Sequence, residues 1–296
     1  MDDFDIPRPP RIEEAQLQRC REAGDFCPIL FQWYQFVGAL CNFFARIRLE
    51  SRDIRAVPAL HYSVLVALLN RCSRLMLANV ALSHEGIFGE TTAILDRCIF
   101  ESVVKVMWLC EKADDESFQR LVLDGLKTDI EFKKAILANV AARGEKRLAI
   151  EQRMLDSIEN YLGTVPTTEA EVTASPKLPD LASMISVIGA DRLMYVVGQR
   201  MGSHHVHGTW PSLFRDYLEE HEGVLGPRDH DCPTHANQYV FVMRIVLDAI
   251  RSFVGFAVLS AEGKAVFISL LDSVQEELEK LNVEVVGADF ELVEDV

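Results

Sequence analysis

The sequence predicts an all-α protein, a multi-helix bundle, from three observations. Apolar residues recur at the spacing of one helix face along most of the chain. No segment shows the sustained alternation of apolar and polar residues that is typical of strands, and no internal repeat is present. Proline and glycine stand between the periodic segments, at positions where helices commonly begin and end.

The first half of the chain contains the longest periodic segments. A short amphipathic helix is expected over residues 13–24, closed by Gly24. Pro28 and Pro58 each favour the start of a long helix, because proline fits the first helical turn. The other helices expected in this half span residues 90–112, 114–143 and 145–163, with a break at Gly144.

The second half alternates helices with two loops. Residues 164–179 are rich in Pro, Thr and Ser and lack an apolar period, which predicts a loop, and residues 223–234 are interpreted in the same way. Helices are expected over residues 180–189, 191–201, 211–221, 235–260 and 262–281. The predicted domains are an N-terminal helical extension over 1–55, a main helical domain over 56–283 and an acidic tail over 284–296.

The composition favours a cytoplasmic protein that does not bind membranes. The net charge of -15 opposes non-specific binding to nucleic acid or to an anionic membrane, but it does not exclude a local basic groove. The seven cysteines form no CxxC pair, which indicates reduced thiols. The two longest apolar segments, Leu60–Leu82 and Tyr239–Leu259, carry central charges that would be costly in a bilayer, so both are expected to be core helices.

The expected helix over residues 90–112 carries a charge pair, Arg97 and Glu101, among neighbours that are apolar nearly all round. Residues four apart share one helix face, so these two side chains are expected to pair. A buried guanidinium has more donors than one carboxylate accepts, and other polar groups should converge on it. The histidine-bearing segment 195–210 is the obvious source of those groups, for a structural ion pair or for a polar pocket.

That segment, YVVGQRMGSHHVHGTW, has three histidines within four residues. Together with AILDRCIFESVVKVMWL it resembles a family of bacterial helical proteins classed as a domain of unknown function. The members pair an L-x-R-x-x-x-E helix with a later S-x-x-x-H-G motif at a helix end. The similarity runs from Ala56 to Leu259. The matching positions are Leu95, Arg97, Glu101, Ser203, His207 and Gly208.

This family is remotely similar to the HEPN superfamily, whose nuclease members carry R-x4-6-H at a helix end. Arg200 with His205, and Arg200 with His207, both fit that spacing. The resemblance implies a metal-independent ribonuclease in bacterial defence or stress, completed by a second copy in a homodimer. His205 or His207 would then move the 2′-hydroxyl proton near neutral pH, and Arg200 would stabilise charge on the phosphoryl oxygens.

Two other interpretations of the histidines stay open. In one, the segment ends a helix, and Ser203 and His207 satisfy Arg97 or Glu101, in a protein that binds a partner protein or a small anion without catalysis. In the other, histidine-rich clusters bind zinc, although their spacing matches no closed zinc finger. The residues of those clusters are His204, His205, His207, His230, Asp231, Cys232 and His235.

We expect one polar pocket where the two segments meet, holding neither metal nor cofactor, with RNA in a local groove as the ligand. The candidate catalytic residues are Arg200, His205 and His207. The candidate binding residues are Arg97, Glu101, Ser203 and Tyr195.

Overall fold

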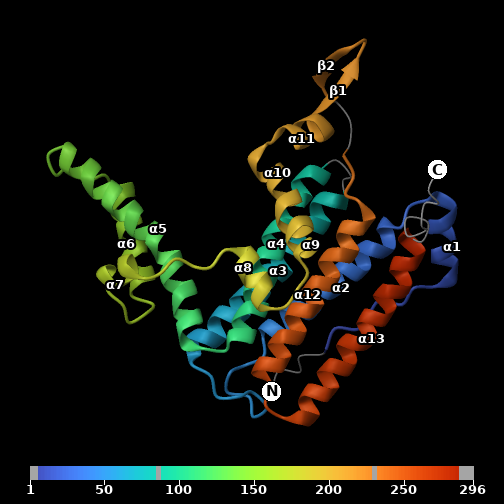
Figure 1. Ribbon diagram of the computed structural model, residues 1–296, viewed down its shortest axis with the longest axis horizontal. Helices are drawn as coiled ribbons and strands as arrows, with labels where there is room; N and C mark the ends of the chain where they lie inside the picture. The colour runs from blue at the N-terminus through green and yellow to red at the C-terminus, as the bar shows by residue number, and fades with distance from the viewer. Residues whose placement is uncertain (1–5, 85–87, 229–231, 287–296) are drawn as a thin grey trace. The chain divides into compact units, whose positions relative to one another are not determined.

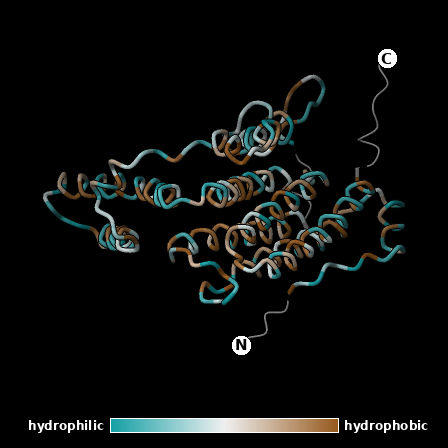
Figure 2. Tube along the Cα trace, turned by 60° about the horizontal axis from the view of Figure 1, so that its bottom comes forward, coloured by the Kyte–Doolittle hydropathy of each residue, from teal (hydrophilic) through white to brown (hydrophobic). Residues whose placement is uncertain are grey.

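The computed structural model describes residues 6–84, 88–228 and 232–286, and it confirms the all-α, multi-helix prediction (Figure 1). The chain forms two compact units, Met1–Glu111 with Leu181–Val296, and Lys112–Asp180. The helices that precede residue 55 therefore belong to the same unit as the helices of residues 59–111 and 181–286, whereas residues 112–180 form a unit of their own. Along most helices hydrophobic and hydrophilic residues alternate within each turn, which gives these helices an apolar side to bury (Figure 2).

The first unit contains most of the helices and one short hairpin. In chain order its elements are α1 (Glu14–Ala23), α2 (Cys27–Ala45), α3 (Ala59–His84), α4 (Gly89–Lys112), α8 (Leu181–Val187), α9 (Arg192–Tyr195), the π-helix η1 (Val196–Met201), α10 (Gly202–His207), α11 (Trp210–Ser212), the π-helix η2 (Leu213–Tyr217), β1 (Leu218–His221), β2 (Val224–Pro227), α12 (Ala236–Ala257) and α13 (Ala261–Val286).

The core of this unit lies where α2 packs against α3 and α12, and α13 covers α12 (Figure 1). Trp33 and Tyr34 of α2 are fully buried, as are Tyr239 and Phe253 of α12. The rings of Tyr34 and Tyr239 meet edge to face, with their centroids 5.4 Å apart. Such a contact contributes about 0.5–1.5 kcal/mol to stability beyond the burial of its apolar area. It holds α2 against α12.

The predicted helix ends coincide with local chain signals. Gly24 closes α1 with a left-handed φ of 64°, and Pro28 stands in the first turn of α2. The Asp114 side chain accepts a hydrogen bond from the Ser117 backbone N–H and so caps the helix that follows, α5 (Asp115–Ala142). α13 continues to Val286, beyond the expected end at residue 281, so the first residues of the expected tail are helical and residues 287–296 lie outside the described part.

The second unit consists of α5 (Asp115–Ala142), α6 (Ala149–Leu162) and α7 (Glu169–Ala174). The prediction of a loop through residues 164–179 was wrong at its centre, where α7 stands. Thr168 and Glu171 form a capping box there, in which each side chain bonds the other's backbone N–H, and this fixes one short helix despite the missing apolar period.

The hairpin corrects two predictions. The helix expected over residues 211–221 ends at Tyr217, and part of the loop expected over 223–234 is a strand. β1 and β2 are antiparallel, with His221 opposite Val224. Both residues of the connecting turn, Glu222 and Gly223, have left-handed φ values, of 52° and 80°, and a turn of that type matches the twist of paired strands.

One helix in the described part of the chain, α3, is long and apolar enough over Ala59–Ser83 to cross a membrane by length and composition alone. Core helices of soluble proteins pass the same test. Here the Arg71 guanidinium donates to the hydroxyl of Ser102 and to the carbonyl of Cys98, both on α4. α3 therefore presents a charged group to its neighbour from the middle of its apolar stretch.

Candidate functional site

The two segments that the sequence singled out meet in the structure, as predicted. Two glycines on the η1–α10 segment allow the contact with α4. A Cβ at Gly198 would lie 2.3 Å from the Phe100 ring, and one at Gly202 would lie 2.8 Å from the Arg97 Cβ. Both distances are too short for a real side chain, so the backbone of one segment lies directly on the side chains of the other.

The predicted pair of Arg97 and Glu101 is formed, but the polar groups expected to complete it, Ser203 and His207, do not do so. Arg97 Nε donates to Glu101 Oε1 over 3.2 Å, and the two side chains are 16% and 28% exposed. The Ser203 hydroxyl donates instead to the Gln199 carbonyl of its own segment, and His207 is exposed. As a result Arg97 Nη1 is buried without a hydrogen-bond partner among the described residues. The expectation that Ser203 and His207 satisfy this pair was wrong.

Arg200 does not join the candidate catalytic histidines. Its side chain is exposed, and the guanidinium lies over the Tyr195 ring at 5.7 Å from the centroid. Arg200 and His207 are seven residues apart and both are exposed, whereas His205 between them faces inward with a side chain that is only 8% exposed. Of the three candidate catalytic residues, the structure brings only His205 into the interior.

A pocket of about 630 Å³ lies beside this contact, between α4, η1, η2 and the start of α12. Both π-helices found in the described residues line it, η1 through Val197 and Gly198 and η2 through Arg215 and Asp216. Such segments are rare and recur at functional sites. The polar residues of the lining are Glu90, Asp96, Arg97, His205, Arg215, Asp216, Arg228, Cys232, His235, Asn237 and Gln238.

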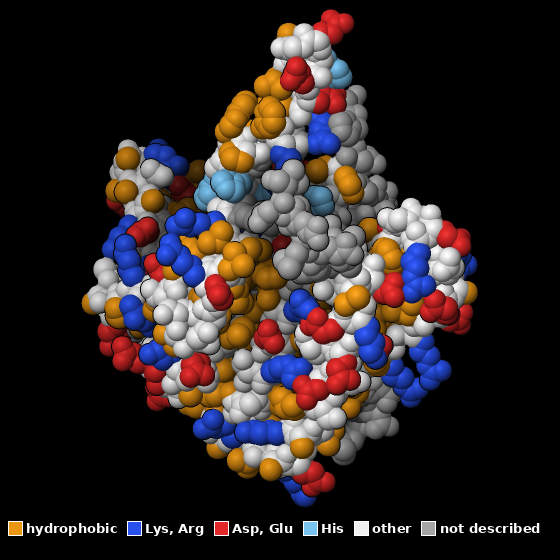
Figure 3. Space-filling view, turned by 45° about the vertical axis from the view of Figure 1, so that its right-hand side comes forward, with side chains coloured by type: hydrophobic (Ala, Val, Ile, Leu, Met, Phe, Trp, Pro, Cys, Tyr) orange, Lys and Arg blue, Asp and Glu red, His pale blue; other side chains and the backbone are white. Residues whose placement is uncertain are grey.

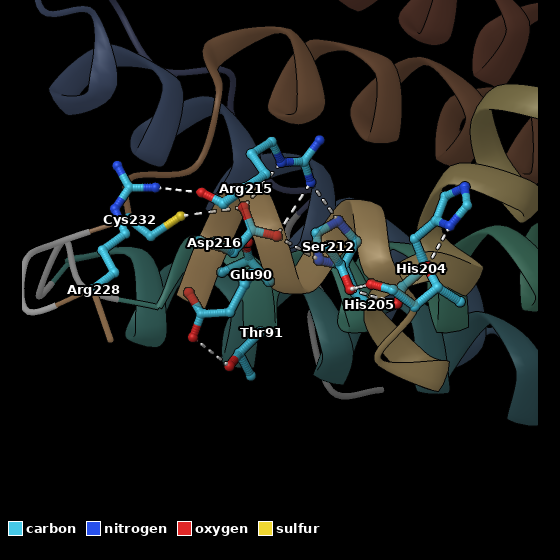
Figure 4. Close-up of polar contacts among 12 residues, drawn as sticks. Glu90, Thr91, His204, His205, Ser212, Arg215, Asp216, Arg228 and Cys232 are labelled. Carbon is cyan, nitrogen blue, oxygen red and sulfur yellow. Dashed lines mark hydrogen bonds and ion pairs between the residues drawn. The ribbon is translucent and has the colours of Figure 1, made fainter. Parts of the chain in front are cut away.

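Three side chains form a cluster on one wall of the pocket, in which His205, Arg215 and Asp216 point toward one another (Figure 4). Asp216 is 4% exposed, and its Oδ1 accepts a hydrogen bond from Arg215 Nε over 2.9 Å. The Nδ1 atom of His205 lies 3.4 Å from Asp216 Oδ2, and its Nε2 lies 2.8 Å from Arg215 Nη2. The histidine is thus held between a carboxylate and a guanidinium.

These contacts fix the tautomer of His205. A guanidinium only donates hydrogen bonds, so Nε2 must be the acceptor and the ring proton must sit on Nδ1. Nδ1 lies 3.4 Å from Asp216 Oδ2 without forming a hydrogen bond in the described part of the chain, so the interaction with the carboxylate is electrostatic. Burial lowers the pKa of His205 below its ordinary value of 6.5, and the charge of Arg215 lowers it further against the opposing effect of Asp216. At neutral pH the ring is therefore neutral, with Nε2 as its basic nitrogen.

Asp96 provides a second perturbed group in the same pocket. Its Oδ1 accepts hydrogen bonds from Asn79 Nδ2 at 2.6 Å and from the Tyr34 hydroxyl at 3.4 Å. Its Oδ2 is buried without a hydrogen-bond partner in the described part of the chain. Burial raises the pKa of Asp96 from 3.8 to about 8, although both hydrogen bonds act in the opposite direction. The proton of the neutral acid therefore belongs on Oδ2.

Buried hydroxyls join the start of α12 to the helices below it. Thr234, just before α12, lies 2.6 Å from Thr92 of α4 and 3.3 Å from Ser83 of α3, hydroxyl to hydroxyl. Ser83 in turn donates to Asn79, the residue that holds Asp96. The Gly89 backbone N–H donates to the Cys232 carbonyl over 2.6 Å. This network fixes the wall that carries His235 and Gln238 relative to Asp96.

The residues proposed for zinc do not assemble within the described ranges. No group of three His, Cys, Asp or Glu side chains able to hold a metal ion occurs there. His204 Nδ1 lies 2.6 Å from the Thr209 hydroxyl, a contact at the end of its own helix. His230 and Asp231 lie outside the described residues.

Three residues of this site were not predicted from the sequence: Asp96, Arg215 and Asp216. Asp96 directly precedes Arg97 in the helix that carries the predicted charge pair. An acidic residue on that mostly apolar helix could have indicated a second polar group of the site. Arg215 and Asp216 fall in a segment expected to be an ordinary short helix, and nothing in their spacing indicates that they face His205.

The sequence matches the model of a family of unknown function, DUF5677, over residues 62–225, which is more than half of the chain. The protein belongs to the DUF5677 family. No curated protein and no solved structure matches it. The DUF5677 region contains α4, η1, α10 and η2, and so all of the His205, Arg215 and Asp216 cluster, whereas α12 and its part of the pocket wall follow it.

Proposed function

We propose that this DUF5677 protein cleaves RNA without a metal ion and that His205 is its catalytic base. One observation carries the proposal: a buried carboxylate, Asp216, lies 3.4 Å from Nδ1 of a neutral histidine whose Nε2 is bonded to Arg215, and all three residues line a pocket of about 630 Å³. A carboxylate that fixes the tautomer and orientation of a histidine is a recurrent arrangement for general base catalysis.

The groups of the pocket fit one balanced reaction. His205 Nε2 takes the proton of a 2′-hydroxyl, whose oxygen then attacks the adjacent phosphorus. The bond from phosphorus to the 5′-oxygen breaks, and Asp96 gives its proton to that oxygen. The products are a 2′,3′-cyclic phosphate and a 5′-hydroxyl.

Two cations stabilise the charge that develops on the phosphoryl oxygens. Arg97 has a buried donor with no partner among the described residues, and a phosphoryl oxygen would satisfy it. Arg215 is 57% exposed, so its guanidinium is free to turn from His205 to the phosphate when substrate binds. In this scheme the base, the acid and the cations all come from one chain. A HEPN-like relationship would rest on His205 alone, since Arg200 and His207 are exposed.

The proposal is tested with the purified protein and a single-stranded RNA that carries a fluorophore at its 5′ end, in buffer with EDTA. We expect cleavage, products that end in a 2′,3′-cyclic phosphate, and a rate that is unchanged by the chelator. The rate should rise with pH through a midpoint below 6.5, as His205 loses its proton, and should fall as the pH passes about 8, where Asp96 ionises.

Absence of cleavage at enzyme concentrations equal to the RNA would refute the proposal, and so would inhibition by EDTA. The unpartnered Arg97 donor favours one alternative, a non-catalytic protein that binds a small anion. Inorganic phosphate that raises the melting temperature of the wild type but not of Arg97→Met, with RNA left intact, would identify that function instead.

A further inference from the structure

Beside the pocket, the α11–η2 segment exposes three aromatic side chains on one face. Trp210, Phe214 and Tyr217 are 60%, 51% and 46% exposed, and their spacing of four and three residues places them along one side of the helical segment. The Trp210 and Phe214 rings lie 5.7 Å apart at an angle of 40°. Hydrophobic side chains gather on this face below the hairpin, next to pale-blue histidines (Figure 3).

These rings need an explanation, because the chain buries its other tryptophans. Trp33 and Trp108 are 1% and 2% exposed. A contiguous group of exposed apolar rings is characteristic of a binding surface. Two classes of ligand use such rings, a protein partner and an unpaired nucleic acid strand whose bases stack on them.

Local charge favours the nucleic acid strand. Residues 192–217 contain three arginines and a single carboxylate, Asp216, in a chain with a net charge of -15. That carboxylate is buried against Arg215 and His205, so it presents little negative charge to a ligand. Arg192 and Arg200 are exposed. Between Asp191 and the acidic hairpin that begins at Leu218, the accessible charge of the segment that carries the aromatic face is therefore positive, which complements a polyanion.

The face is joined to the pocket through η2. η2 carries Phe214 and Arg215 as neighbours, the first with its ring exposed and the second in the pocket beside His205. An RNA strand whose phosphate binds Arg215 would therefore bring a neighbouring nucleotide within reach of Phe214. The acidic hairpin, with Glu219, Glu220 and Glu222, follows the aromatic face directly in the chain.

We infer that Trp210 and Phe214 form a stacking subsite for unpaired RNA bases next to the pocket, and that Tyr217 extends it. The choice of RNA as the ligand rests on the proposed function. Bases that are paired and stacked in a duplex cannot open onto these rings, so the subsite selects single strands over duplexes.

Tryptophan fluorescence of the full chain tests the subsite without cleavage. In His205→Asn, which lacks the base but keeps an N–H donor toward Asp216, we expect a single-stranded 10-nucleotide RNA to quench the emission of exposed Trp210. The same strand annealed to its complement should quench it far less. Trp33 and Trp108 are buried and give a constant background.

Variants of the rings measure their contribution. Stacking of one base on one ring is worth about a tenfold change in Kd, so Phe214→Ala should weaken binding of the labelled single strand about 10-fold, and Trp210→Ala by a similar factor in fluorescence anisotropy. Val224→Ala is the matched control, because Val224 is 69% exposed, apolar and on the hairpin. It should leave the Kd unchanged.

The outcomes separate this inference from the proposed function. Quenching by single strands together with intact RNA in the wild type retains the subsite and rejects catalysis. Cleavage with the same KM in the wild type and in the Trp210→Ala/Phe214→Ala double variant retains catalysis and overturns the subsite. The subsite is also overturned if no RNA quenches Trp210, and if the double variant instead converts a dimer into a monomer, the face is a protein interface.

Discussion

His205→Ala is expected to lower the rate of RNA cleavage by about 100- to 10,000-fold, which is the usual contribution of a general base, whereas Arg200→Ala and His207→Ala should stay within about twofold of the wild type. The reason is orientation. His205 is buried against Asp216 and Arg215, but Arg200 lies over Tyr195 on the outside and His207 is exposed. Single-turnover cleavage of a labelled RNA by the three variants gives the comparison.

His205→Asn separates loss of the base from loss of the fold. Its side-chain amide offers an N–H to Asp216, so the melting temperature should stay close to that of the wild type while cleavage is lost. The opposite pattern, with cleavage lost in Arg200→Ala or His207→Ala and retained in His205→Asn, would place the reaction at the exposed helix end and contradict the assignment.

The second large effect concerns stability. The free energy of unfolding of the wild type should fall as the pH rises from 7 to 9, and Asp96→Asn should remove most of that fall. The pKa of Asp96 is about 8 in the folded protein and near 3.8 in the unfolded chain, so the folded state holds the extra proton. Stability that depends on this proton is complete below the unfolded pKa and is lost as the pH passes the folded one.

Urea unfolding at pH 7 and pH 9 measures this effect, with Asp248→Asn as the comparison. Burial also raises the pKa of Asp248, but Arg251 and Arg244 oppose that shift, so its variant should retain most of the pH dependence. His205 does not contribute in this range, because its lowered pKa acts at more acid pH. Parallel pH dependences for Asp96→Asn and the wild type would show that Asp96 is ionised in the folded protein.

The helical architecture follows from signals that are local in the sequence. Proline and glycine mark chain reversals by restricting or freeing φ, so Pro28 and Gly24 predict their helix boundaries correctly. The hairpin was not predicted, because four-residue strands are too short to show alternation of apolar and polar residues. Its turn also has Glu222 at a position where asparagine or glycine would have indicated a hairpin.

The site was predicted in part. The approach of the Arg97 helix to the histidine segment follows from the rule that a buried guanidinium needs partners, and the structure confirms the approach. Which histidine turns inward does not follow from spacing, because the π-helix η1 shifts the register of the residues after it. The partner Asp216 lies eleven residues beyond His205, after a break at Gly208 and inside the second π-helix, and no periodicity links the two.

Everything proposed for the pocket depends on a neutral His205 whose proton sits on Nδ1 and whose Nε2 accepts a proton once Arg215 has turned from it to the phosphate. Nuclear magnetic resonance of protein labelled with ¹⁵N-histidine reports both properties for the individual ring as the pH is changed. The account predicts an Nδ1–H tautomer at pH 7 and a pKa below 6.5 that rises when Arg215 is replaced by Ala. A ring that is protonated on Nε2 at pH 7, or one that titrates above 6.5, would contradict it.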